Sequence, residues 1–397
     1  MNIIKQRIKT DLRLEEVDLA KQIGRYAYFK TMSSSSQPIT RIEGKDYFNF
    51  GSNNYLGLTN HQEVIEASKE AISKWGTGCT GSRLLNGTIE LHLELEEELA
   101  AFYGKESALV FPTGYTANLG VLSSLLTRHD TVVVDERIHA SLWDGIMLSK
   151  ARSKKFDHND PSALESLLSK MASPPNLCIT EGVFSMEGDM PLLRELMEIC
   201  KKNDIFLLVD EAHALGVVGS TGKGASEYYK VIKEVDAITI TFSKSLAGCG
   251  GAVIGDKRVI DYIKMNSRPF LFTASNTPSS LASVLTSLKI LQRQPQMIKE
   301  LENKKIFFYD ELKKNGIPVS KNESAILTIP IGDDFRVLQA WKVLWNRKVF
   351  CNPVLTPAVK LNEGILRFSL TLSHTYEQLE EVAKTCRQLL PLISTED

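Results

Sequence analysis

A lysine, an aspartate and a histidine in this sequence stand near the ends of predicted buried strands. Lys244 comes three residues after the apolar run 236–241, while Asp210 closes the run 205–210 and His213 follows it. Because the carboxyl ends of neighbouring parallel strands lie at one edge of a sheet, we expect the three side chains to converge. An amine can form an imine with an aldehyde, and a carboxylate can keep a pyridine nitrogen protonated. The set therefore predicts a site for pyridoxal 5'-phosphate.

A phosphate site is indicated at the start of a predicted helix. The segment Phe111-Pro-Thr-Gly114-Tyr115-Thr-Ala-Asn118 follows an apolar run and opens a helical pattern. Unpaired N–H groups and the helix dipole favour an anion at such a start. Gly114 and Tyr115 could therefore hold a phosphate. The alternative is a plain strand-to-helix turn, and this motif alone does not decide between the two.

Three more polar residues could complete such a site. His139 follows the run 131–135, and a neutral imidazole there can lie over a flat cofactor, hold a carboxylate and move a proton. Ser185 lies in the loop after the run 177–180, where its hydroxyl could bind a phenolate oxygen. Arg367 lies in an apolar segment, and its planar guanidinium suits the α-carboxylate of an amino acid. Each has an ordinary alternative when taken singly: a structural histidine, a turn serine and a surface arginine.

The elements that would position these residues form an α/β pattern. Short apolar runs alternate with longer helical patterns between about residues 60 and 280. The runs are 108–111, 131–135, 177–180, 205–210, 237–241 and 251–255. This alternation predicts a large parallel-sheet domain with helices on both faces and ligands at the carboxyl ends of the strands. The more charged residues from about 285 onward predict a small C-terminal α+β domain that ends in a helix over 375–392.

The N-terminal residues are expected to lie outside the main sheet. Residues 1–30 have the spacing of an amphipathic arm, with apolar residues at Ile4, Ile8 and Leu12. Residues 40–50 read as a hairpin that turns at Gly44. We therefore divide the chain into an arm with the start of the hairpin, a large cofactor-binding domain and a small domain, over 1–45, 46–284 and 285–397.

The overall composition argues against several classes of protein. The chain has 397 residues, and its 47 Lys and Arg balance 48 Asp and Glu, so no net field would attract nucleic acid. No stretch approaches the roughly 18 consecutive apolar residues of a membrane span, and the N-terminus lacks the apolar core of a secretory signal. The six cysteines show no spacing typical of zinc ligands or of a redox pair. We expect a cytoplasmic protein without a structural metal.

Taken together, the motifs resemble those of the α-oxoamine synthase family of fold-type I pyridoxal phosphate enzymes, over nearly the whole chain. The motifs are Gly51-Ser-Asn-Asn54-Tyr-Leu-Gly57-Leu, Asp210-Glu-Ala-His213-Ala-Leu-Gly216, Gly219-x-x-Gly222-x-Gly224 and Thr241-Phe-Ser-Lys244. The resemblance implies that Lys244 forms the imine, that Asp210 pairs with the pyridine nitrogen and that His139 stacks on the ring and takes part in catalysis. The other implied contacts are His213 and Ser185 to the ring oxygen, Gly114, Tyr115, Thr241 and Ser243 to the phosphate, and Asn53 and Arg367 to the substrate carboxylate.

The resemblance also implies a homodimer with active sites at the subunit interface. Thr273 would then reach the phosphate bound by the other subunit. Three segments are most similar to the soluble bacterial serine palmitoyltransferases of the family: Arg25–Phe29, Gly76–Thr88 and Phe350–Ala358. That branch condenses L-serine with a long-chain acyl-CoA, palmitoyl-CoA, to 3-ketosphinganine, CoA and CO2, the first step of sphingolipid synthesis. A lipid product could bring the N-terminal arm to the inner face of a membrane as a peripheral contact.

Other functions stay open at this point. Lys30, Asn276 and Cys249 depart from the family pattern, and Asn276 could alter the substrate channel. A related synthase that uses cysteate, phosphoserine, glycine or alanine with another acyl thioester is therefore an alternative. An alternative of a different class is a catalytically silent partner subunit. Such subunits typically lack the lysine, so Lys244 argues against that role.

Overall fold

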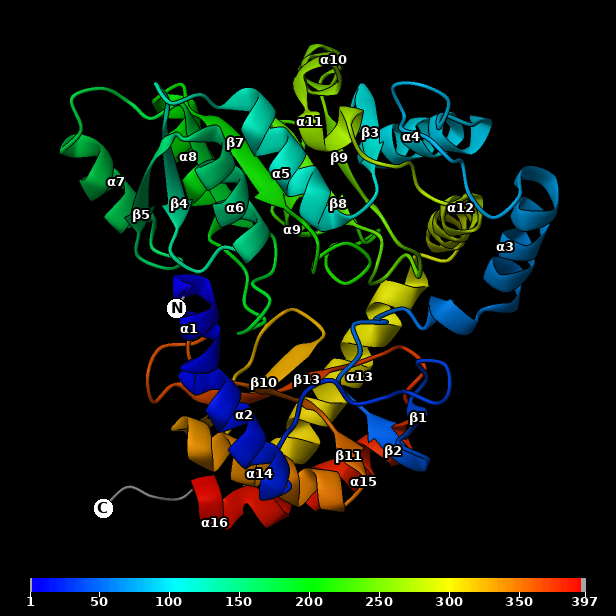
Figure 1. The fold of residues 1–397 in the computed structure, drawn as a ribbon, viewed down its shortest axis with the longest axis vertical. Coiled ribbons are helices and arrows are strands. Elements are labelled where there is room, and N and C mark those ends of the chain that lie inside the picture. The colour runs from blue at the N-terminus through cyan, green and yellow to red at the C-terminus, as the bar shows by residue number, and fades with distance from the viewer. Residues whose placement is uncertain (1, 394–397) are drawn as a thin grey trace.

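A seven-stranded sheet forms the centre of the larger unit, in the upper half of Figure 1. The structure is a computed structural model that describes residues 2–393. The strand order is β3-β9-β8-β7-β6-β4-β5. The strands are β3 (Ser107–Phe111), β4 (Thr131–Asp135), β5 (Arg152–Phe156), β6 (Leu177–Glu181), β7 (Phe206–Asp210), β8 (Ala237–Thr241) and β9 (Gly251–Gly255).

The predicted parallel pairing holds for this sheet except at β9. That strand is antiparallel to both β3 and β8. Only residues 242–250 join β8 to β9, and a parallel crossover needs about a dozen residues or more. The predicted parallel sheet is therefore confirmed for β4 to β8 and wrong only at β9. The edge strand β5 was not predicted, because four of its five residues are exposed and it has no apolar run.

Helices cover both faces of the large sheet. They are α3 (Gln62–Trp75), α4 (Glu90–Tyr103), α5 (Gly114–Leu125), α6 (Ala140–Ser149), α7 (Pro161–Ser169), α8 (Leu193–Lys202), α9 (Ala225–Tyr228), α10 (Lys257–Asn266), α11 (Arg268–Leu271) and α12 (Pro278–Arg293), with a 3-10 turn at Leu58–Asn60. Because successive strand side chains point to opposite faces, Val132 and Val134 share one apolar cluster with Leu142 of α6. Val133 instead belongs to the cluster that contains Leu196 of α8.

The smaller unit lies below the large sheet in Figure 1 and contains two three-stranded sheets. One has the order β10-β13-β12 (Ile326–Gly332, Gly364–Ser369, Asn352–Val354), and the other has the order β1-β2-β11 (Ile39–Ile42, Lys45–Asn49, Val349–Phe350). Its helices are α13 (Gln296–Lys314), α14 (Asp334–Asn346), α15 (Tyr376–Cys386) and α16 (Leu390–Ile393), with a 3-10 turn at Arg387–Leu389. The predicted terminal helix over 375–392 is thus present but interrupted.

The predicted hairpin is confirmed, and its pairing assigns it to the smaller unit. Ile42 pairs with Lys45 across a turn in which Glu43 and Gly44 have positive φ angles of 47° and 76°. Glycine adopts such angles without strain. The second strand, β2, then pairs with β11. Residues near position 45 are therefore joined by hydrogen bonds to residues 300 positions later in the chain.

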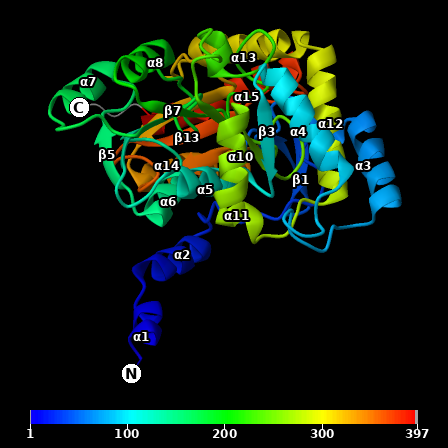
Figure 2. The same ribbon diagram turned by 90° about the horizontal axis from the view of Figure 1, so that it is seen from above.

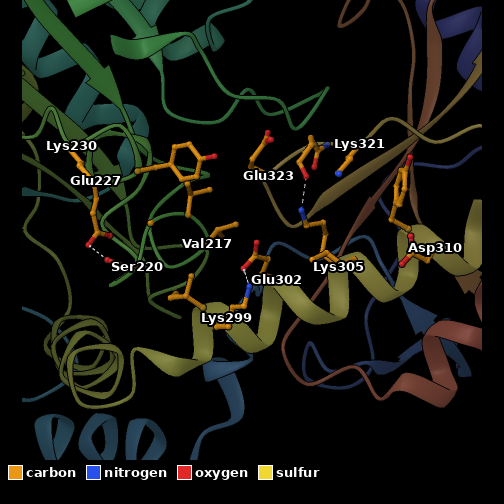
Figure 3. A pocket seen from close by; sticks show the side chains of 17 residues that line it. Val217, Ser220, Glu227, Lys230, Lys299, Glu302, Lys305, Asp310, Lys321 and Glu323 are labelled. Atoms are coloured by element: carbon orange, nitrogen blue, oxygen red, sulfur yellow. Dashed lines mark hydrogen bonds and ion pairs between the residues drawn. The ribbon is translucent and has the colours of Figure 1, made fainter.

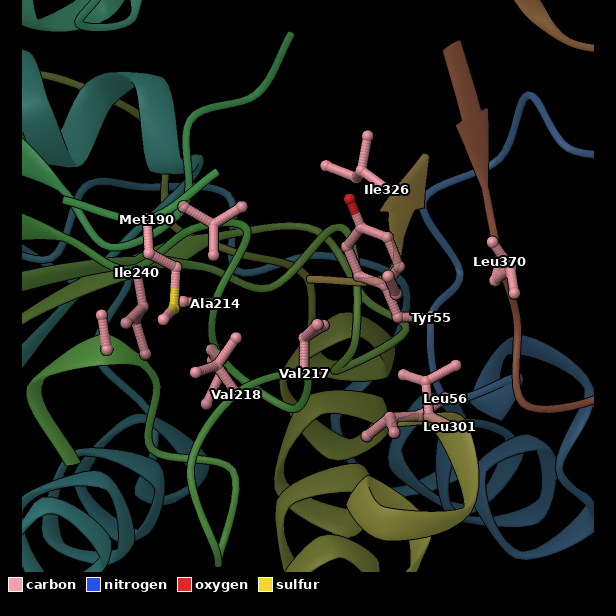
Figure 4. Close-up of a cluster of buried hydrophobic side chains, with 14 of the residues drawn as sticks. Tyr55, Leu56, Met190, Ala214, Val217, Val218, Ile240, Leu301, Ile326 and Leu370 are labelled. Carbon is pink, nitrogen blue, oxygen red and sulfur yellow. The ribbon is translucent and has the colours of Figure 1, made fainter. Parts of the chain in front are cut away.

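One apolar core runs through both units. Val217 and Val218, in the loop after β7, belong to the same cluster as Leu301 of α13 and Ile326 of β10. Figure 4 shows these residues around Tyr55, which is fully buried. Because the core is shared, the edge of the large sheet is held against the smaller unit.

The N-terminal arm is helical and lies outside this core. It contains α1 (Ile3–Lys9) and α2 (Leu12–Gln22), and neither has a buried residue. Figure 2 shows both helices projecting from the rest of the molecule. Among residues 2–393, no helix combines the length and the apolar character needed to cross a bilayer.

Candidate active site

The ends of strands β6, β7 and β8 form the floor of a cavity of 250 Å³. Asp210 ends β7 and pairs in register with Glu181 of β6 and Thr239 of β8. Lys244 follows β8 and also lines the cavity. The structure thus brings together eight of the predicted site residues: Gly114, Tyr115, His139, Asp210, His213, Thr241, Ser243 and Lys244.

Lys244 is held in a state suited to imine chemistry. Its side chain is desolvated within the cavity, and this lowers the pKa of Lys244 to about 8, although Asp210 and Glu181 oppose the shift. With that pKa, about a tenth of the lysine is a free amine at pH 7. A solvent-exposed lysine would have a far smaller nucleophilic fraction. The cavity therefore activates Lys244 toward an aldehyde.

The Asp210 carboxylate is oriented by two donors. Its Oδ2 accepts from Nδ2 of Asn118 at 2.7 Å, and its Oδ1 accepts from the backbone N–H of Ala212 at 2.9 Å. Asn118 also donates to Oγ of Ser141 at 2.9 Å. Asn118 and Ser141 were not predicted as site residues. Asn118 was within the quoted helix-start motif, but no sequence signal indicates that it contacts a residue 92 positions away.

His139 caps α6 and faces the cavity. Its Nδ1 accepts from the backbone N–H of Ser141 at 3.2 Å, so the neutral ring carries its proton on Nε2. Desolvation lowers the pKa of His139, which favours that neutral form. The backbone N–H of His139 donates to the buried carboxyl group of Glu181, a residue that the sequence did not single out. The imidazole therefore stands as a neutral donor at the cavity wall.

The phosphate end of the cavity depends on a close backbone approach. Gly114 is the first residue of α5, and a Cβ added to it would lie 2.7 Å from Cβ and 2.8 Å from Oγ1 of Thr241. Only glycine allows the free N–H groups of the α5 start to come this near to Thr241. The Thr241 hydroxyl lies 3.1 Å from that of Ser243. An anion cradle, an amine and an oriented carboxylate together fit pyridoxal phosphate.

A second cavity of 640 Å³ adjoins the first and shares His139, His213 and Lys244 with it. Asn53, Ser185 and Arg367 also line it, as do apolar residues of the segment 353–358. The first cavity thus opens into a larger space that is partly apolar. A flat cofactor in the first would face a substrate in the second.

The buried Arg367 is held by neutral acceptors. Its Nε donates to the carbonyl oxygen of Ser185 at 2.6 Å, and its two terminal nitrogens donate to Oδ1 of Asn53 at 3.2 and 3.3 Å. No carboxylate forms an ion pair with it among residues 2–393. A buried guanidinium without an anion is unfavourable. This position therefore suits the carboxylate of a substrate.

Thr273 is the predicted site residue that the structure does not bring to either cavity. It is half-buried in the segment after α11. Its predicted contact is with the cofactor of another subunit, so its role stays a prediction. The roles of the other site residues also stay predictions, although their positions agree with them.

Another cavity, of 650 Å³, lies between the loop 217–230 and α13 (Figure 3). Charged side chains line much of it, and two of its lysines have partners within the chain. Lys299 pairs with Glu302 at 2.8 Å, and Lys305 donates to the carbonyl oxygen of Asn322 at 2.6 Å. None of the predicted site residues lines it. We therefore place the chemistry in the two adjoining cavities at the edge of the sheet.

Comparison with known proteins agrees with this geometry. The model of the aminotransferase class I and II family matches residues 45–385. A serine palmitoyltransferase of Sphingobacterium spiritivorum is 43% identical over 369 residues, which cover 93% of this chain and 92% of that protein. An 8-amino-7-oxononanoate synthase of Bacillus subtilis is 36% identical, covering 94% and 97%.

Solved structures lead to the same family. A structure described as SPT with PLP internal aldimine has a TM-score of 0.94 and 32% identity, covering 99% of both chains. A Sphingomonas wittichii serine palmitoyltransferase has a TM-score of 0.93 and 32% identity, covering 98% of both chains. These matches confirm the predicted family resemblance, the fold-type I architecture and pyridoxal phosphate as the cofactor. The chain therefore belongs to the aminotransferase class I and II family, among the pyridoxal-phosphate-dependent acyltransferases of the α-oxoamine synthase group.

Proposed function

We propose that this chain is a serine palmitoyltransferase. It condenses L-serine with a long-chain acyl-CoA, palmitoyl-CoA, and releases CoA and CO2 to give 3-ketosphinganine. The observation that carries an amino-acid substrate is the buried Arg367 beside Asn53, without an anionic partner in the described chain and facing the cavity that contains Lys244. The choice of serine is supported by the names of similar relatives, which are serine palmitoyltransferases.

The residues of the chain divide the chemistry among them. Bound pyridoxal phosphate supplies an electron sink for the bond that breaks at Cα. Arg367 and Asn53 bind the substrate carboxylate and so orient Cα. The amine of Lys244 would take the Cα proton at Nζ. Asp210 would keep the pyridine nitrogen protonated, which the electron sink requires.

The acyl donor is proposed to enter through the larger cavity. Its wall contains Pro353, Val354 and Leu355, whose apolar side chains suit an acyl chain. His139 also lines this cavity, and its Nε2–H can donate to the thioester oxygen as negative charge develops there. The same imidazole would support the substrate carboxylate before CO2 leaves.

A homodimer with shared active sites is part of the proposal. Three large apolar side chains near the segment of Thr273 are mostly exposed in the single chain: Leu85 at 80%, Met265 at 70% and Phe272 at 67%. Exposed apolar groups of this kind are typical of subunit interfaces. Burial of this surface by a second copy would bring Thr273 to the partner's phosphate. Sedimentation at micromolar concentration tests it, and a monomer that is fully active would contradict it.

We also propose that the enzyme works in the cytoplasm. The six cysteines are free thiols, which suits a reducing compartment. The exposed apolar residues of α1 and α2 are proposed to touch either a partner subunit or the inner face of the membrane. Flotation with anionic vesicles, with and without residues 1–23, separates these two contacts.

The function is tested by thiol release from palmitoyl-CoA. The purified chain is incubated with L-serine, glycine, L-alanine, L-threonine, phosphoserine or cysteate in parallel, and the product is identified by mass. We expect release with serine and formation of 3-ketosphinganine. Lys244→Ala should abolish turnover, and a variant that kept it would contradict the assignment. Selective release with another amino acid would move the enzyme to another branch of the family.

The named alternative is an α-oxoamine synthase for a different amino acid or thioester. It is supported by the 8-amino-7-oxononanoate synthase relative at 36% identity over 94% of the chain. Arg367 would bind the carboxylate of any α-amino acid, so this contact does not distinguish the alternatives. The thiol-release assay with the panel of amino acids distinguishes them.

A further inference from the structure

Tyr55 links the substrate subsite to the cofactor subsite. It follows β2 and is fully buried within the apolar cluster of Figure 4. Its hydroxyl lies 2.8 Å from Nδ1 of His213 and 3.3 Å from Oδ1 of Asn53. A tyrosine hydroxyl has one proton, so it can donate to only one of these two atoms.

The acceptor capacity of Asn53 decides which atom receives the proton. Its Oδ1 has two lone pairs, and it already faces Arg367 donors at 3.2 and 3.3 Å. The hydroxyl of Ser369 lies 3.2 Å away from the same oxygen. The contact from Tyr55 to His213 is also the shorter of its two contacts. The proton of Tyr55 is therefore directed to Nδ1 of His213.

The direction of the hydrogen bond between Tyr55 and His213 matters because of the protonation state of His213. Burial, together with the charges of Lys244 and Arg367, lowers the pKa of His213 well below its usual range, so the ring is neutral. A neutral imidazole carries one proton, on one of its two nitrogens. If Nδ1 accepts from Tyr55, the proton is on Nε2. His213 lines both active-site cavities, and Nε2 is the ring nitrogen left to face them.

We propose that Tyr55 is a positioning residue that fixes His213 as the Nε2–H tautomer, so that His213 presents a donor to the ring oxygen of the cofactor. This rests on the proposed contact of His213 with that oxygen. An anionic or partly anionic ring oxygen needs a donor, and the other tautomer would oppose it with a lone pair.

The tautomer can be read directly by nitrogen NMR. The full chain is labelled with 15N-histidine, and the spectra are recorded with the cofactor removed and with it bound. Signals of His213 are assigned by their loss in His213→Asn. We expect Nδ1 of His213 to be unprotonated and Nε2 to be protonated in the cofactor-free chain. A protonated Nδ1 would overturn the proposal, because His213 would then be the donor to Tyr55.

Cofactor affinity supplies the second readout. Tyr55→Phe should weaken binding of pyridoxal phosphate about tenfold, as expected for the loss of one hydrogen bond that holds a ligand group. It should also change the ratio of the absorption bands of the bound cofactor. Tyr103→Phe is the matched control, because the Tyr103 hydroxyl is also buried and has no hydrogen-bond partner among the residues that the structure describes.

The outcomes separate this proposal from the proposed function. We expect Tyr103→Phe to bind the cofactor within about twofold of the unchanged chain, since no hydrogen bond is lost there. Wild-type affinity and band ratio in Tyr55→Phe would overturn the positioning role. Neither measurement uses an amino acid or an acyl-CoA. An enzyme that turned out to prefer another amino acid would therefore leave the result for Tyr55 unchanged.

Discussion

Arg367 directs both of its terminal nitrogens at a single atom of Asn53, Oδ1, at 3.2 and 3.3 Å. The two residues come from opposite ends of the chain, because Arg367 lies on β13 and Asn53 follows β2. The amide of Asn53 is neutral, so it orients the guanidinium without neutralising it. The remaining charge is available to an anion in the adjoining cavity.

Arg367→Lys should weaken amino-acid binding and leave cofactor binding intact. Lysine keeps the charge but loses the planar pair of donors. We expect KM for the amino acid to rise about 10- to 100-fold, which corresponds to one or two charge-assisted hydrogen bonds. Steady-state kinetics measure this, and the cofactor absorbance reports binding. Arg41→Lys, at an exposed ion pair with Asp46, is the control. An unchanged KM in Arg367→Lys would contradict the proposed binding of the substrate carboxylate by Arg367.

Gly114→Ala should damage the phosphate cradle. The new methyl group would lie 2.7 Å from Cβ of Thr241, so the start of α5 must move away from β8. We expect the dissociation constant of pyridoxal phosphate to rise at least about tenfold, because the backbone N–H groups at the start of α5 would move out of hydrogen-bond distance of the phosphate. Fluorescence titration of the cofactor-free chain measures it. Gly78→Ala serves as the comparison, since a Cβ there would meet no atom of residues 2–393 within 4 Å. Equal affinities in the two variants would refute the cradle.

The main strands and the residues at their ends could be predicted because both are local in sequence. An apolar run of five residues and a polar residue after it are visible without any tertiary contact. This is why Lys244, Asp210 and His139 were placed correctly at the sheet edge. The same reasoning explains the failure at β5, whose exposed residues Arg152 to Lys155 have no apolar pattern.

The contacts that hold the site together could not be predicted from local patterns. Asn118 contacts Asp210 across 92 positions, and Tyr55 contacts His213 across 158. Such pairs depend on how the strands are ordered and how the two units pack. The sequence signal for such pairs is therefore weak in a single chain. The direction of β9 is different, because the predicted runs 237–241 and 251–255 already leave too few residues between them for a parallel crossover.

Asp210→Asn should separate cofactor binding from its activation. The substitution keeps the size of the side chain but removes the charge that holds a proton on the pyridine nitrogen. We expect the cofactor to remain bound, while exchange of the Cα proton of serine with deuterated solvent slows at least about 100-fold. NMR of serine follows the exchange. With Asp46→Asn, at an exposed position of β2, the Cα proton of serine should exchange as fast as with the unchanged chain. Rapid exchange in Asp210→Asn would exclude this role of the carboxylate.

Covalent capture of pyridoxal phosphate should follow the titration of Lys244. Since desolvation lowers the pKa of Lys244 to about 8, the free-amine fraction rises about tenfold between pH 7 and pH 9 and then levels off. A lysine with the usual pKa would give about a hundredfold rise and no plateau. Borohydride quenching of the cofactor-free chain, mixed with cofactor at each pH, measures the rate of capture. Lys244→Ala gives the background, and the absence of a plateau below pH 10 would contradict the shift.

His158 joins two carboxylates that border the active site. Its Nδ1 lies 2.9 Å from Asp135, at the end of β4, and its Nε2 lies 3.0 Å from Asp189, in the loop that contains Ser185. Desolvation disfavours the charged ring, but the hydrogen bonds to both carboxylates outweigh it and raise the pKa of His158 to about 9. The imidazolium thus holds the Ser185 loop to the sheet edge.

This pairing should make the effect of His158→Gln on stability depend on pH. Because the folded pKa lies above the usual value, the ion pairs stabilise the fold fully below about pH 6.5 and lose their effect as the pH rises through about 9. We expect the variant to lower the free energy of unfolding by about 2 kcal/mol more at pH 6 than at pH 9.5. Urea unfolding at several pH values measures this difference. His92 and His374 do not titrate in that window, because burial lowers the pKa of each to about 3. His129→Gln, at an exposed position, is the control. If His158→Gln lowered the free energy of unfolding by the same amount at every pH in this range, the ring would act by packing alone.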